Sequence, residues 1–333
     1  MDYPWYLCQS DADLKKKFSF IQIQEDERLR EATNAANHYS RWSLGVSISP
    51  ENDLRNRYVN IMPYERNRVH LQSRGKNSND YINASYTKVD VPGQSMSPGY
   101  YIATQGPTKA TWEQFWQMCY DECPKKDIVI VMVTPLIEHG REKCHQYWPM
   151  GEASDTERFS PKIQCPSGDP TRDSTEFRRD LTIKFVDSKR YNNQYTLTTL
   201  DLIPKSSREP VKSVHHFYFD QWRDMSRPQE VVPIMELCQH SHRLNSTGNP
   251  IIVHCSAGVG RSGTFIALDH LIHDTKDFNF TKGKLLPTAY KRDLIEQIVL
   301  QLRLQRMKMV QMSDQFLFIY HAARYLFDLQ TGQ

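Results

Sequence analysis

The feature that most constrains this chain is the stretch from Pro250 to Phe265, with the sequence PIIVHCSAGVGRSGTF. Apolar and β-branched residues lead up to His254 and Cys255, closely spaced glycines follow, and an apolar-periodic run begins after Ser262. This pattern predicts a strand, a tight loop and then a helix that begins at Ser262. Such a turn directs backbone N–H groups inward at a helix N-terminus, so it predicts a binding site for a phosphate-sized anion.

Cys255 is expected at the floor of this site, where it has the chemistry of a nucleophile. A free thiol is mostly protonated at neutral pH, but the helix dipole, the inward N–H groups and Arg261 all favour the thiolate. The planar fork of Arg261 can hold two oxygens of a phosphoryl group, which a lysine could not do. Ser262 is expected to donate a hydrogen bond to the sulfur when it leaves.

Three other interpretations of these residues are less favoured. Gly258, Gly260 and Gly263 match the dinucleotide fingerprint GxGxxG, but the predicted helix is followed by a polar loop and a second helix. No second strand carries a ribose-binding carboxylate about 20 residues further on. The Walker phosphate loop fails because Arg261 stands where its lysine should be. A buried structural cysteine is disfavoured because small and polar residues follow Cys255.

The segment HCSAGVGRS, residues 254–262, resembles the HCx5R[ST] signature of the tyrosine-specific protein phosphatases. The resemblance covers about residues 50–330 and continues through four further segments: NDYINAS (79–85), TQGP (104–107), KCHQYWP (143–149) and QMSDQF (311–316). Over its whole length the chain is most similar to the single-domain soluble phosphatases of yeasts and other fungi.

The expected architecture is a single α/β domain with a highly twisted mixed β-sheet, helices on both faces and the phosphate-binding loop between a strand and a helix. Residues 46–330 would form the catalytic domain, and residues 1–45 an N-terminal helical arm. Within the arm, residues 10–36 are predicted to be helical, and Lys15, Lys16 and Lys17 are predicted to form a solvated face.

Periodicity predicts the other elements of the domain. The apolar run 128–133 indicates a fully buried central strand, and residues 150–178 indicate a polar surface loop. Further strands are predicted at 81–86, 100–104, 181–185, 195–202 and 214–219. Helices are predicted at 111–123, 228–244, 292–307 and 313–329, the last with Ser313 or Asp314 as its cap.

The resemblance implies a two-step reaction with Cys255 as the nucleophile, preceded by His254 of the signature. Asp224, next to Trp222 in the segment DQWRDMSRP, matches the general acid of a mobile loop. The family usually has Trp-Pro-Asp there, whereas this chain has Arg223 in place of the proline, so we expect an active enzyme with altered loop kinetics. Gln311 matches the residue that positions the hydrolytic water.

The resemblance also implies how substrate is held. Tyr58 would form a deep aromatic wall that admits phosphotyrosine and stops the shorter phosphoserine above the sulfur. Asn60 stands where the family usually has an aspartate, which predicts weaker peptide binding. Glu138 would orient Arg261. The other substrate-binding positions implied are Lys143, Ser256, Ala257, Gly258, Val259, Gly260 and Gln315.

Composition limits compartment and partners. Seven cysteines, an odd number without paired spacing, indicate reduced thiols and a cytoplasmic or nuclear protein. A net charge of +3 spread along the chain gives no signal for nucleic acid or membrane. No apolar run approaches the ~20 residues of a membrane span. We expect a monomer without metal or cofactor, whose partners are phosphotyrosine-containing proteins.

Two alternatives remain open at this point. A dual-specificity phosphatase uses the same Cys-x5-Arg loop, but the Tyr58 wall argues against it. A phosphotyrosine-binding pseudophosphatase would use the pocket without turnover. Arg223 and Asn60 favour that interpretation, whereas the intact set of Cys255, Arg261, Asp224 and Gln311 opposes it.

Overall fold

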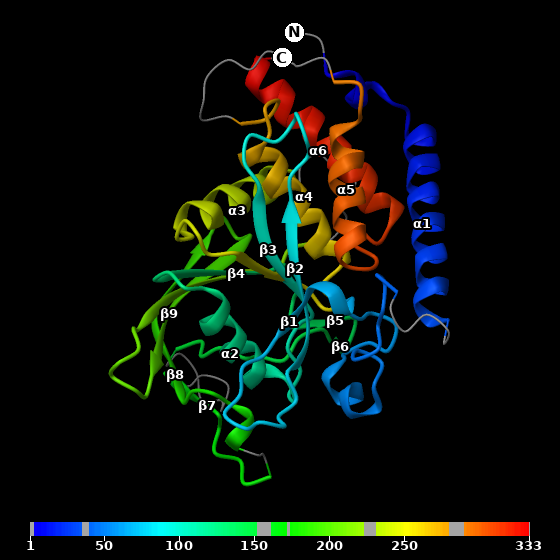
Figure 1. Ribbon diagram of the computed structural model, residues 1–333. Coiled ribbons are helices and arrows are strands. Elements are labelled where there is room, and N and C mark those ends of the chain that lie inside the picture. The colour runs from blue at the N-terminus through cyan, green and yellow to red at the C-terminus, as the bar shows by residue number, and fades with distance from the viewer. Residues whose placement is uncertain are drawn as a thin grey trace.

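A twisted nine-stranded sheet runs through the described part of the chain and carries helices on both faces (Figure 1). The computed structural model describes residues 3–34, 40–151, 161–171, 174–222, 231–279 and 290–332. The strand order is β1-β2-β3-β11-β4-β10-β9-β8-β7, and the four central strands β3, β11, β4 and β10 are parallel. The predicted fold class, one α/β domain with a mixed sheet, is confirmed.

The strands are β1 Arg68–His70, β2 Tyr81–Val89, β3 Gly99–Thr104, β4 Asp127–Met132, β5 Ile137–Glu138, β6 Arg141–Glu142, β7 Lys162–Cys165, β8 Leu181–Tyr191, β9 Tyr195–Pro204, β10 Lys212–Phe219 and β11 Ile251–His254. The α-helices are α1 Asp11–Thr33, α2 Trp112–Glu122, α3 Val231–Leu244, α4 Gly260–Asp274, α5 Leu294–Gln305 and α6 Ser313–Thr331. Short 3-10 helices cover Trp5–Cys8, Pro50–Arg55, Glu65–Asn67 and Ser174–Glu176.

Strand β4 shows how one apolar run serves two cores. Its side chains alternate across the sheet, as the pleat requires. Val129 and Val131 pack with helices α3 to α6, whereas Ile128 and Ile130 pack with α2 on the opposite face. The run was predicted as a buried central strand, and it lies between β11 and β10 with every residue from 128 to 132 fully buried.

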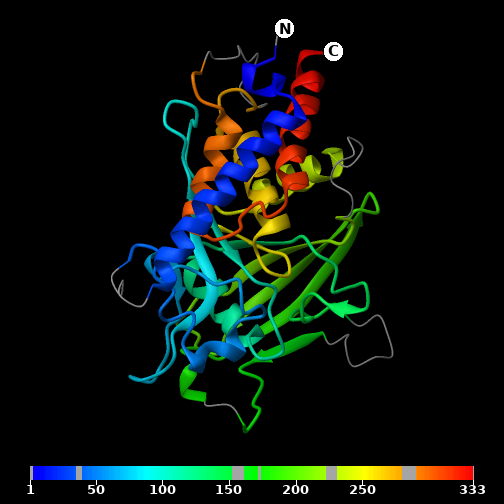
Figure 2. The ribbon, with the colours of Figure 1, turned by 90° about the vertical axis from the view of Figure 1, so that its right-hand side faces the viewer.

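The N-terminal helix α1 lies across α5 and α6 on the outside of the larger helical layer (Figure 2). Leu14 and Ile21 enter the main core. The prediction of a solvated lysine face is wrong at Lys17, because its ammonium group lies 3.0 Å from Asp293 Oδ2 and 2.9 Å from Glu296 Oε2. This side chain therefore ties α1 to the first turn of α5.

Several predicted boundaries differ from the structure. The predicted polar loop 150–178 contains strand β7, whose pairing with β8 makes it an edge of the sheet. Helix α4 begins at Gly260, two residues before the predicted start, and Met312 rather than Ser313 or Asp314 occupies the N-cap of α6. Strand β8 continues to Tyr191, beyond its predicted end at residue 185, so only three residues separate it from β9. Asn192 and Asn193 take the positive φ that allows such a short hairpin turn.

Helix α1 ends at Thr33, with Asn34 as its C-cap, so the predicted helix over 10–36 is too long. Residues 35–39 lie outside the described residues, as do residues 228–230 at the predicted start of the helix now seen as α3.

Candidate active site

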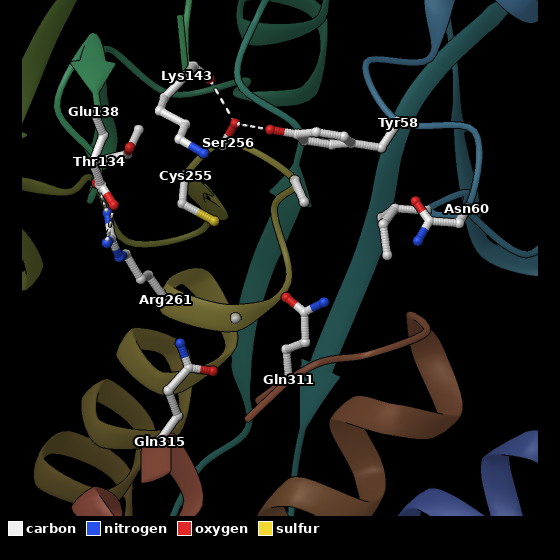
Figure 3. Close-up of a pocket in the computed structure, with 13 residues that line it drawn as sticks. Tyr58, Asn60, Thr134, Glu138, Lys143, Cys255, Ser256, Arg261, Gln311 and Gln315 are labelled. Carbon is white, nitrogen blue, oxygen red and sulfur yellow. Dashed lines mark hydrogen bonds and ion pairs between the residues drawn. The ribbon is translucent and has the colours of Figure 1, made fainter. Parts of the chain in front are cut away.

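A pocket of about 290 Å³ opens where the parallel strands β3, β4 and β11 end (Figure 3). This is the edge at which ligands bind in open α/β sheets. Cys255, directly after β11, lies in it with 5% of its surface exposed, and its sulfur points into the pocket. The pocket is lined by Tyr58, Asn60, Ile61, Thr134, Glu138, Lys143, Cys255, Ser256, Ala257, Gly260, Arg261, Gln311 and Gln315.

The loop after Cys255 can fold only with glycine at position 258. Gly258 has a φ of 77°, and a Cβ at this position would lie 2.1 Å from the carbonyl oxygen of Thr104. The N–H of Gly258 donates to the sulfur of Cys255 at 3.2 Å. The turn thus directs a backbone donor at the sulfur. Gly258 and Val259 form the body of the loop without lining the pocket.

Arg306, which follows α5, holds the outer side of the phosphate loop. Its guanidinium donates to the carbonyl oxygens of Gly258 and Ala257, both at 3.0 Å, and also to Ser85 Oγ and Asn83 Oδ1. Burial lowers the pKa of Arg306 to about 10, so it stays charged at neutral pH. With the loop carbonyls engaged on this side, the loop N–H groups are left to face the pocket. Arg306 was not predicted.

Arg261 is oriented by Glu138, as the resemblance implied. The two form a bidentate pair, with Nη1 2.8 Å from Oε2 and Nη2 3.0 Å from Oε1. These hydrogen bonds hold the pKa of Glu138 below its usual value, so the carboxylate is charged. Glu138 ends β5, whose pairing with β6 forms a small separate hairpin beside the pocket. The planar fork of Arg261 is thus fixed at the pocket wall.

Tyr58 forms the wall opposite Arg261, and its hydroxyl is anchored. Tyr58 Oη lies 2.7 Å from Ser256 Oγ, which in turn donates to the carbonyl oxygen of Lys143 at 2.8 Å. The preceding residue, Arg57, donates to the carbonyl oxygens at positions 106 and 107, which fixes the backbone beside the ring. Asn60, also in the pocket lining, completes this side.

Gln311 and Gln315 approach from the loop between α5 and α6 and from the first turn of α6 (Figure 3). The side chain of Gln315 accepts the N–H of Met312 at 3.1 Å, which holds the start of the helix. Figure 3 shows the two glutamines on the side of Cys255 opposite Lys143.

His254 lies behind the phosphate loop and does not line the pocket. Its Nδ1 is 3.0 Å from the carbonyl oxygen of Cys255, and its Nε2 is 2.7 Å from the hydroxyl of Tyr147, which also contacts His216. Burial lowers the pKa of His254 to about 4, so the ring is neutral at pH 7. The structure thus places His254 as a support of the loop backbone.

Two further predicted residues, Ser262 and Trp222, lie away from the pocket lining. Ser262 is fully buried in the first turn of α4, and its hydroxyl has no hydrogen-bond partner among the described residues. Trp222 is buried in the main core. Asp224 and Arg223 lie outside the described residues.

Two lining residues were not predicted, Ile61 and Thr134. Thr134 closely follows the buried run 128–133, so the rule that sites form at the carboxyl ends of parallel strands could have selected it. Ile61 carried no such signal.

Within the part of the chain that the structure describes, one group outside the pocket has the residue types of a metal site: His242, Asp269 and His273. The two imidazole rings are stacked 3.9 Å apart at an interplanar angle of 10°. Lone pairs in nearly parallel planes do not converge on one ion. The buried Asp269 carboxylate instead accepts a hydrogen bond from Tyr101, and it raises the pKa of His242.

The Y_phosphatase family model, described as protein-tyrosine phosphatase, matches residues 52–325. The chain belongs to the protein-tyrosine phosphatase family.

Curated relatives agree with this assignment. The chain is 65% identical to Tyrosine-protein phosphatase 1 of Saccharomyces cerevisiae, with 99% of each protein covered. It is 33% identical to Tyrosine-protein phosphatase 1 of Schizosaccharomyces pombe over 93% of this chain and 50% of that protein. The chain is thus a protein-tyrosine phosphatase.

Solved structures share the fold. The catalytic domain of human protein tyrosine phosphatase non-receptor type 18 matches with a TM-score of 0.70 and 27% identity, covering 95% of this chain and 96% of that one. A second structure, PTPN18 in complex with HER2 phosphopeptides, matches with a TM-score of 0.67 and 26% identity.

Among the described residues, every helix is too short or too polar to cross a lipid bilayer.

Replacing Glu138 with Gln tests the support of Arg261. Loss of the charged bidentate partner frees the guanidinium, so we expect kcat/KM on an aryl phosphate to fall about 10- to 100-fold. Glu142→Gln is the matched control, because this exposed carboxylate lies 4.0 Å from its nearest cation, Arg57. Equal activity of the two variants would contradict the orienting role.

The buried histidines predict acid sensitivity. His254 and His216 have pKa values lowered by burial, so below about pH 6.5 the unfolded chain binds more protons than the folded chain. The free energy of unfolding should therefore fall with decreasing pH, by about 1.4 kcal/mol per pH unit for each histidine. Urea unfolding across this range should give a shallower slope for His216→Phe than for wild type.

Proposed function

We propose that this enzyme hydrolyses phosphotyrosine in proteins through a cysteinyl-phosphate intermediate. The observation that carries the proposal is the placement of Cys255 at the floor of a pocket bounded by Arg261, Tyr58 and Gln311. The aromatic wall and the phosphate cradle fit the two halves of a phosphotyrosine side chain. The HER2 phosphopeptides bound to a protein of the same fold are ligands of this kind.

In the first step, Cys255 Sγ attacks phosphorus in line with the tyrosine oxygen. The S–P bond forms as the P–O bond breaks, and the leaving oxygen takes a proton from Asp224. Arg261 and the N–H groups of the loop from 256 to 260 stabilise the charge on the equatorial oxygens. Ser262 donates to the sulfur when it is later displaced.

In the second step, Gln311 places a water molecule against the cysteinyl-phosphate. The water oxygen attacks phosphorus, the S–P bond breaks, and the carboxylate of Asp224 accepts the proton. Gln315 assists from the first turn of α6, and Lys143 lies in the pocket lining. The charge stabilisation comes from side chains and backbone alone, so the reaction as written uses no metal or cofactor.

Tyr58 accounts for the choice of residue. Because its hydroxyl is fixed to Ser256, the wall has a constant height above the sulfur. A phosphotyrosine reaches the sulfur, whereas the shorter phosphoserine or phosphothreonine stops above it. Asn60 supplies an uncharged acceptor for the substrate backbone, which gives weaker peptide binding than an aspartate would.

We further propose that the enzyme acts as a monomer in a reducing compartment, the cytoplasm or nucleus. All seven cysteines are free thiols, and the nucleophile must stay reduced to act.

Paired peptides of one sequence, carrying phosphotyrosine or phosphothreonine, test the substrate class. Wild type should release phosphate from the phosphotyrosine peptide at least about 100-fold faster, because only that side chain reaches the sulfur. Cys255→Ser should abolish release from both. Equal rates on the two peptides would indicate a dual-specificity phosphatase. Tight binding of phosphotyrosine peptide without release by wild type would indicate a pseudophosphatase.

The pH–rate profile tests Asp224. The wild-type rate should fall at low pH, where the thiolate is protonated, and at high pH, where Asp224 loses its proton. Asp224→Ala should lower kcat about 10²- to 10⁴-fold and remove the fall at high pH. Asp220→Asn, four positions earlier, is the control, because this carboxylate pairs with Arg190. An unchanged high-pH limb in Asp224→Ala would exclude it as the general acid.

A further inference from the structure

The loop that carries Gln311 has an unfavourable backbone. Lys308 and Val310, both between α5 and α6, have φ values of 62° and 58°. A β-branched residue such as Val310 rarely takes this conformation, because its Cβ crowds the backbone. Such residues persist only where the surroundings hold them. The position of Gln311 therefore depends on whatever fixes these residues.

The N-terminal helix α1 supplies part of that support through Glu25. This side chain is fully buried, and its carboxylate accepts the backbone N–H of Lys308, at 3.0 Å from Oε1 and 3.2 Å from Oε2. Glu25 is separated from Lys308 by 283 positions in sequence. A charged acceptor on a backbone N–H is among the stronger hydrogen bonds in proteins.

Arg303, near the end of α5, completes the support. It is also fully buried and donates to Glu25 at 2.9 Å and to the carbonyl oxygens of Met309 and Val310, the latter at 2.9 Å. Gln22, one turn before Glu25, accepts from the same guanidinium. The ion pair thus holds one N–H and two carbonyl groups in the three residues before Gln311.

The same loop contacts the phosphate loop directly. The N–H of Val310 donates to the carbonyl oxygen of Val259 at 3.0 Å. The approach is close because position 263 is glycine, where a Cβ would lie 2.5 Å from Val310 N. A continuous set of contacts therefore runs from α1 through Glu25 and Val310 to the loop that contains the nucleophile.

A buried ion pair contributes little net stability, because desolvating both charges offsets their attraction. The Glu25–Arg303 pair is better explained by the backbone groups that it fixes. We propose that Glu25 and Arg303 are positioning residues for Gln311, so that helix α1 belongs to the machinery for hydrolysing the cysteinyl-phosphate. This inference rests on the proposed function, because it takes the second step as the task of Gln311.

Steady-state and rapid-mixing kinetics of the full chain on an aryl phosphate separate positioning from stability. In Glu25→Gln, the first step should proceed normally and the second should slow. We expect kcat and KM to fall together by about 10- to 100-fold, and phosphoenzyme to accumulate after a burst of phenol. kcat/KM should stay within about twofold of wild type, because it covers only the steps up to phenol release.

A second variant guards against loss of folding. The double change Glu25→Leu with Arg303→Met replaces the pair by apolar groups of similar size, so no unpaired charge is left buried. Urea unfolding of this variant measures the stability that remains. It still lacks every hydrogen bond that the pair makes to the loop, so it should show the same fall in KM and the same phosphoenzyme. Wild-type kinetics in this folded double variant would overturn the proposal.

Two reference variants complete the test. Asp121→Asn weakens another largely buried ion pair, with Arg179, far from the loop, and should leave KM and the burst unchanged. Gln311→Ala should reproduce the Glu25→Gln phenotype. A parallel fall of kcat and kcat/KM in both Glu25 variants, with KM unchanged, would show a merely structural role and overturn the inference alone. Absence of phosphoenzyme in Gln311→Ala would overturn the proposed second step as well.

Discussion

The geometry of the active site depends on how Arg306 engages the phosphate loop. A loop that presents N–H groups to an anion must place its carbonyl groups elsewhere, and buried carbonyl groups need donors. The guanidinium provides several donors in a fixed fork, and it binds the carbonyl oxygens of Ala257 and Gly258 while its other N–H groups reach β2. It also adds a positive charge behind the loop, on the side away from solvent. Arg306 therefore both holds the shape of the phosphate loop and adds to the positive charge around it.

The sheet brings the separate parts of the site together. Parallel strands β3, β4 and β11 end at one edge, so Cys255 and Thr134 meet there although they are far apart in sequence. Around that edge, three of the groups that line the pocket each have a support: Glu138 for Arg261, Ser256 for Tyr58, and the Glu25–Arg303 pair for the loop of Gln311. The nucleophile itself has a backbone donor, the N–H of Gly258.

Local sequence was sufficient for the strand, loop and helix around Cys255, because glycine spacing and apolar periodicity specify them directly. Tyr58, Glu138 and Gln311 look like ordinary polar residues by themselves, and only the family resemblance selected them. Arg306 and Glu25 could not be predicted, because their partners lie 48 and 283 positions away and depend on helix packing. Strand β7 was missed for a similar reason, since its pairing with β8 rather than its own pattern defines it.

The bond between Tyr58 and Ser256 has a consequence for how substrates are chosen. Because the hydroxyl of Tyr58 is held by Ser256 in the phosphate loop, the depth of the pocket is fixed. Under the proposed function, a pocket of fixed depth distinguishes a phenyl phosphate from an alkyl phosphate but carries no information about the protein to which the tyrosine belongs. Under the same proposal, the selection of one phosphoprotein over another depends on the surface beside the pocket, where Val59 and Met312, the neighbours in sequence of the lining residues Asn60 and Gln311, are exposed.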